Sequence, residues 1–92
     1  MIQALLFSYN KIQQLIPVII EGMVLDKKSG RPISNAWVHV VSGEEAITDT
    51  NGEFLIKSWQ PVPLNLFVEH GEYETTIVTV SSLAKKLVIQ LC

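Results

Sequence analysis

Residues 22–41 read GMVLDKKSGRPISNAWVHVV, and this stretch decides the fold. A β-rich run ends at the polar cluster 26–30, which Pro32 follows, and a second β-rich run occupies residues 36–41. Glycine and proline between two apolar runs mark a turn. The stretch therefore predicts two strands joined by a polar connection.

The same pattern continues downstream as short β-rich runs separated by turn residues. Seven strands are predicted from it, at residues 18–25, 36–41, 45–48, 53–58, 64–70, 73–80 and 86–91. Even spacing of short strands is typical of a sandwich of two sheets. We therefore expect an all-β, seven-stranded Greek-key β-sandwich that forms one domain over residues 18–92.

Alternation along these strands separates a core face from an outer face. The predicted core comprises Ala36, Val38, Val40, Phe54, Ile56, Leu64, Leu66, Val68, Leu87, Ile89 and Leu91. Trp37, Val41, Leu55 and Phe67 fall on the opposite side, where a solvated sheet carries polar residues. These four residues are the predicted partner interface. Their cover is the N-terminal segment, a second copy of the chain, or another protein.

The N-terminal segment, residues 1–17, has a different pattern. Apolar residues recur at steps of three and four, at Ile2, Leu5, Tyr9, Ile12 and Ile16, which is typical of an amphipathic helix. The segment is too short and too polar to span a bilayer, and no basic residue precedes its apolar start as in a secretory signal. A helix packed on the domain, a swapped arm and a processed leader all remain open.

Composition limits the function classes. The chain has 92 residues, 48% hydrophobic and 17% charged, with a formal net charge of -2. This composition indicates a globular domain, and the absence of a basic stripe argues against nucleic acid as a partner. Cys92 is the only cysteine, so the chain cannot form an internal disulfide.

No metal, cofactor or catalytic set is predicted. Asp49, Asn51 and Glu53 in DTNGEF alternate as in a calcium loop, but Gln60 stands where an EF-hand requires its bidentate glutamate. A tight Asn-Gly hairpin is the better interpretation. His39 and His70 have no partner ligands in sequence, and no serine lies in a nucleophile motif. We expect both histidines to be structural.

Trp59 and Tyr73 support an alternative function. Their rings offer flat apolar faces that could stack on a sugar or another small ligand. They are the predicted ligand-binding residues of a carbohydrate or small-ligand module.

From residue 18 to residue 91 the order of motifs resembles that of the carboxypeptidase regulatory-like domains, which share the transthyretin-like (prealbumin-like) sandwich. The matching residues are Gly22, Asp26, Gly30, Pro32, Ala36, Val38, Val40, Thr48, Asp49, Gly52, Phe54, Leu64, Leu66, Val68, Gly71, Tyr73 and the closing residues 88–91. The chain departs from the family's pattern at Glu72, which separates Gly71 from Tyr73.

The resemblance implies a non-catalytic module that docks to or supports another protein, or self-associates, in a cell-envelope or exported system. The first strand also looks like that of the hydroxyisourate hydrolases, which are enzymes of the same fold. Met23 stands where those hydrolases carry a catalytic histidine, and Glu53 where they carry an arginine. We therefore expect no enzymatic activity.

Overall fold

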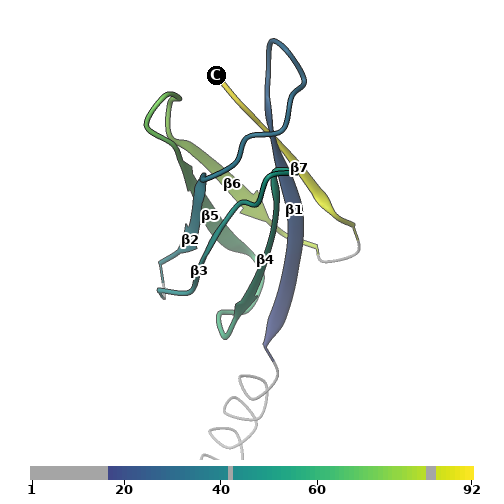
Figure 1. The fold of residues 1–92 in the computed structure, drawn as a ribbon. Coiled ribbons are helices and arrows are strands. Elements are labelled where there is room, and N and C mark those ends of the chain that lie inside the picture. Colours follow the sequence, from purple (N-terminus) through teal and green to yellow (C-terminus); the bar gives the residue numbers. More distant parts are fainter. Residues whose placement is uncertain (1–16, 42, 83–84) are drawn as a thin grey trace, which may run out of the picture.

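The computed structural model describes residues 17–41, 43–82 and 85–92, and all the regular structure in them is strand (Figure 1). The seven strands are β1 (Val18–Asp26), β2 (Trp37–Val40), β3 (Glu45–Ile47), β4 (Glu53–Ser58), β5 (Leu64–Glu69), β6 (Thr76–Val80) and β7 (Leu87–Leu91). Each predicted strand is present. The largest difference is at β6, because residues 73–75 belong to the turn before it.

The strands form two sheets, ordered β4-β1-β7 and β3-β2-β5-β6, which lie as two layers in Figure 1. β1 pairs antiparallel with β4 and parallel with β7. The pairs within the four-stranded sheet are all antiparallel. The predicted β-sandwich is confirmed.

The core lies between the sheets and follows the predicted alternation. Ten of the eleven predicted core residues are buried, and Leu87 is half-buried against them. The core also contains Ile20, Val24, Ile33 and Val80. Gly22 belongs to the same layer, because a Cβ atom there would lie 2.6 Å from the Phe54 ring.

The connection from β3 to β4 is a turn but not a hairpin. The Asp49 carboxylate accepts hydrogen bonds from the backbone N–H groups of Asn51 and Glu53, at 2.9 Å each. Gly52 has a φ of 73° and packs against β1, where Val24 N–H donates to its carbonyl. The hairpin prediction was wrong because β3 and β4 belong to different sheets. An Asn-Gly signal fixes a local turn, whereas sheet membership depends on distant partners.

The buried hydroxyl of Thr48 holds the start of this connection, just after β3. Thr48 Oγ1 accepts a hydrogen bond from the backbone N–H of Ala36 at 2.9 Å and donates one to the carbonyl of Ile33 at 2.7 Å. Thr48 is 2% exposed. This side chain therefore fastens the end of β3 to the segment that leads into β2.

The amphipathic prediction for residues 1–17 falls almost wholly outside the described residues. Within the part of the chain that the structure describes, there is no helix of the length and hydrophobicity that crossing a bilayer requires.

Candidate functional site

The outer side of the four-stranded sheet carries a cluster of rings. Trp37 and His39 alternate along β2, and the register of β2 with β5 places Phe67 directly beside His39. The Trp37 and His39 rings stack with centroids 3.9 Å apart, and the His39 and Phe67 rings stack at 5.3 Å. We call the outer side of this sheet around the three rings the aromatic face.

Two carboxylates hold the rings in place. Trp37 Nε1–H donates a hydrogen bond to Glu45 Oε1 on β3, at 2.6 Å. His39 Nε2 and Glu69 Oε2 on β5 also lie 2.6 Å apart. Each polar ring edge thus has an acidic partner on a neighbouring strand, which fixes the ring orientation.

The aromatic face is exposed and framed by aliphatic side chains. Trp37 is 40% exposed, while Ile47 on β3 and Ile77 on β6 are 56% and 59% exposed. Ile47 pairs with Trp37, and Ile77 with Phe67, in the strand register. The result is a contiguous apolar and aromatic surface across all four strands, which is the kind of surface that marks interaction sites.

The predicted interface residues divide between the two sheets. Trp37 and Phe67 both lie on the aromatic face, joined through His39. Val41 follows the end of β2 and is 77% exposed. Leu55 is 47% exposed but lies on β4, in the three-stranded sheet.

Sequence reasoning did not identify His39, Glu45 and Glu69 as parts of this surface. The available signal was strand alternation. It places His39 on the same outer side of its strand as Trp37, and Glu69 on the same outer side as Phe67. Alternation within a strand could not show which strands are neighbours in the sheet. The register of β2 with β3 and β5 supplies that information.

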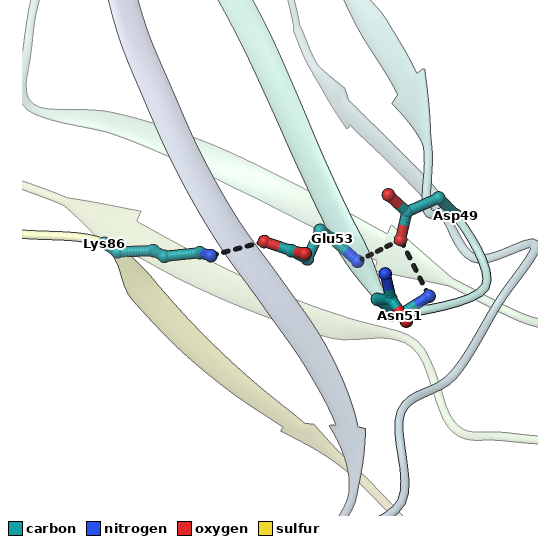
Figure 2. A network of polar contacts seen from close by, with 4 residues as sticks. All are labelled: Asp49, Asn51, Glu53 and Lys86. Carbon is teal, nitrogen blue, oxygen red and sulfur yellow. Dashed lines mark hydrogen bonds and ion pairs between the residues drawn. The ribbon is translucent and has the colours of Figure 1, made fainter.

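The outer side of the three-stranded sheet, which we call the opposite face, is organised differently. Its exposed apolar residues are Ile19, Leu55 and Val88. Ile19 pairs with Lys57 and Leu55 with Glu21, whereas Val88 pairs with the half-buried Met23. Lys86 Nζ and Glu53 Oε2 form an ion pair at 2.5 Å (Figure 2). This hydrogen bond from Lys86 to Glu53 raises the pKa of Lys86 above its ordinary value, with smaller contributions from the nearby carboxylates of Glu21 and Asp49.

The positions that would carry catalysis in a hydrolase meet on the opposite face. Met23 on β1 pairs directly with Glu53 on β4. A thioether cannot act as a general base, and the Glu53 carboxylate is engaged with Lys86. The described residues also contain no group of three or more His, Cys, Asp or Glu side chains that could hold a metal ion. In Figure 2 the Asp49 carboxylate points at the turn backbone.

Trp59 and Tyr73, the alternative ligand-binding residues, are far apart. Ser58 pairs with Val18 at the start of β1, so Trp59 lies near that end. Tyr73 lies at the other end, where its hydroxyl donates to Asp26 Oδ2 at 2.7 Å. Since β1 has nine residues, the two rings are separated by about 26 Å of strand. They do not form one site.

The Asp26–Tyr73 hydrogen bond joins the end of β1 to the segment between β5 and β6, and so links the two sheets. Both residues line a hollow of about 540 Å³, together with Leu91 and Cys92. The backbone N–H of Ser29 and then the Tyr73 hydroxyl hold the pKa of Asp26 below its ordinary value of 3.8. The same hydrogen bond to Asp26 raises the pKa of Tyr73 above 10.0. His70 packs edge-on against Tyr73, and its Nδ1 accepts a hydrogen bond from Glu72 N–H.

A sequence profile of the carboxypeptidase regulatory-like domain matches residues 19–91 of this chain. No curated protein matches the sequence. The profile therefore covers both sheets and every strand except the first residue of β1.

The solved structures that match this chain include the following two. One is a chain of a type II cohesin–X-dockerin complex from Acetivibrio cellulolyticus, with a TM-score of 0.65, 24% identity and coverage of 80% of this chain and 56% of that chain. The other is a 9R-lipoxygenase from Cyanothece, with a TM-score of 0.48, 15% identity and coverage of 84% of this chain and 16% of that chain. The first similarity supports the sandwich fold.

Proposed function

This chain belongs to the carboxypeptidase regulatory-like domain family, and on that premise we propose that it is a non-catalytic β-sandwich module that docks to another protein through its aromatic face. The observation that carries the proposal is the organisation of that face. Trp37 is 40% exposed although it stacks on His39 and bonds to Glu45. A ring that is both fixed and exposed suits binding, because little conformational entropy is lost when a partner covers it.

The composition of the face also suits a protein partner. Tryptophan is enriched among the residues that dominate binding energy in protein interfaces, and such residues lie at the centre of a patch. Trp37 lies on β2, which has neighbours on both sides in the sheet. Ile47 and Ile77 extend the apolar surface to the outer strands on either side.

A catalytic role has less support. Met23 and Glu53 occupy the positions where a hydrolase of this fold needs a histidine and an arginine. The family to which the chain belongs is that of a regulatory-like domain. The setting that we propose for the module, a cell-envelope or exported assembly, rests on the family resemblance.

Site-specific photo-crosslinking tests the proposal. p-Benzoylphenylalanine replaces Ile77 on the aromatic face or, as a matched control, Val88 on the opposite face. The two positions are similarly exposed, at 59% and 62%. We expect a discrete protein adduct from position 77 in the native cells, lost when Trp37 is changed to alanine, and no such adduct from position 88. The absence of any protein adduct at position 77, or equal adducts at both positions, would count against the proposal.

A further inference from the structure

We propose that the aromatic face binds an arginine- or lysine-bearing segment of the partner protein, with Trp37, Glu45 and Ile47 contacting the basic side chain. This inference rests on the proposed function and adds the chemistry of the partner. It is carried by the charge and the geometry of the described residues on the face.

The charge of the aromatic face has one sign. Strand alternation and register place nine described side chains on it, namely Trp37, His39, Glu45, Ile47, Asn65, Phe67, Glu69, Ile77 and Thr79. Two of these carry a carboxylate, and none is a lysine or an arginine. Complementary charge steers partners and selects among them, so this face favours a basic segment.

Of the two carboxylates, Glu45 is better placed than Glu69 to bind a basic side chain. Its described partner is the neutral indole N–H of Trp37, so its negative charge is not compensated. Glu69 shares its carboxylate with the imidazole of His39. One oxygen of Glu45 accepts the indole hydrogen bond, and the other accepts none from the described part of the chain. That second oxygen is available to a guanidinium or ammonium group.

Trp37 and Ile47 supply the other contacts of this proposed site. One face of the indole packs against the His39 ring, and Trp37 is 40% exposed. A cation over an indole is attracted by the ring quadrupole. Ile47 pairs with Trp37 in the register and is 56% exposed. The aliphatic stem of an arginine or lysine can lie along such a side chain while its charged end reaches the acid.

A second copy of this chain fits the aromatic face less well. On the opposite face, Lys57 and Lys86 are balanced by Glu21 and Glu53, so the two faces are not complementary in charge. The loop after β1 carries Lys27, Lys28 and Arg31, and self-association through this loop is therefore one outcome that the test distinguishes.

The test is an NMR titration of the isotope-labelled chain with three blocked peptides, acetyl-GRGRG-amide and its glutamine and glutamate counterparts. We expect the arginine peptide alone to shift the Trp37 indole resonance and the amides of residues 45–47. Glu45→Gln keeps an oxygen for the indole hydrogen bond but removes the charge. It should weaken arginine-peptide binding about fivefold, the scale of a partly exposed charge pair. Glu21→Gln, a carboxylate on the opposite face, is the matched control and should leave binding unchanged.

The remaining outcomes overturn the inference. Shifts spread over both faces, equal shifts with the glutamine peptide, or an unaffected Glu45→Gln variant would each exclude a site for a basic side chain at Trp37. Shifts on the aromatic face that depend on protein concentration without peptide would replace the basic partner with a second copy. A crosslinked adduct at position 77 whose yield is unchanged in Glu45→Gln would overturn the proposed site for a basic side chain while leaving the proposed function intact.

Discussion

The two outer faces of the sandwich expose apolar side chains to similar degrees but arrange them differently. On the aromatic face, Trp37 stacks on His39, which stacks on Phe67, and acids on adjacent strands hold the ring edges. On the opposite face, Ile19 and Leu55 are each paired with a charged residue across the strands. Exposure alone does not identify a binding surface. Contiguity and fixed geometry are the features on which we propose the aromatic face as the binding surface.

The strand register explains this difference. The pairing of β2 with β5 brings the rings of His39 and Phe67 side by side, and alternation along β2 adds Trp37. The pairing of β1 with β4 instead places Ile19 against Lys57 and Glu21 against Leu55. Single exposed apolar residues among charges are normal on a protein surface.

The largest effect is expected at the buried Thr48 hydroxyl, which fastens the end of β3 to the segment that leads into β2. Thr48→Val keeps the side-chain volume but leaves the N–H of Ala36 and the carbonyl of Ile33 without their buried partner. Each unsatisfied buried group costs about 1–3 kcal/mol, so we expect the free energy of unfolding to fall by about 3 kcal/mol. Equilibrium urea unfolding followed by tryptophan fluorescence measures it.

Thr79→Val is the matched control for this prediction. Its hydroxyl donates to Asn65 on the exposed aromatic face, at 2.8 Å, so its loss should change stability by no more than about 0.5 kcal/mol. If both variants lost the same stability, the buried anchor at Thr48 would have no special role.

The next effect concerns binding rather than folding. Once the partner is identified, Trp37→Ala should lower its affinity about thirtyfold, or about 2 kcal/mol, as for a central interface residue. Leu55→Ala removes a side chain of comparable exposure from the opposite face and should change affinity less than about twofold. Titration calorimetry measures both. Equal losses would abolish the distinction between the two faces.

A pH effect is expected at the Asp26–Tyr73 link, which joins the end of β1 to the loop between β5 and β6. The Ser29 N–H and the Tyr73 hydroxyl lower the pKa of Asp26 in the folded protein, so the unfolded chain binds the proton more readily. The contribution of Asp26 to the stability of the fold is present above pH 3.8 and is lost as pH falls through the lowered pKa. The pKa of Tyr73 is raised, so its contribution is lost as pH rises beyond 10.0.

Thermal unfolding across this pH range, compared with Tyr73→Phe, tests the link. The variant lacks the hydroxyl, so it should lose less stability than the wild type at acid pH and at alkaline pH. The loss of stability that Tyr73 ionisation causes at alkaline pH should be absent from it. Identical pH profiles for the two proteins would show that the link does not contribute to stability.

The core was predictable from the sequence, whereas the acidic partners on the aromatic face were not. Alternation within one strand assigns Val38 inward and Trp37 outward without any knowledge of neighbours. The contacts of Trp37 with Glu45 and of His39 with Glu69 depend on how β3 and β5 are placed beside β2. The same dependence explains why the turn at residues 49–52 was predicted but the sheets on its two sides were not.

The smallest effect should come from the ion pair on the opposite face. Lys86→Gln removes the contact with Glu53, whose side chain is 40% exposed. Exposed ion pairs are screened by solvent and contribute little to stability. We therefore expect the urea midpoint to change by an amount close to the measurement error and partner affinity to stay at the wild-type value. Lys57→Gln, a lysine of the same face without an ion pair among the described residues, is the control. If Lys86→Gln alone weakened partner binding, the opposite face would belong to the interface and the two surfaces would act together.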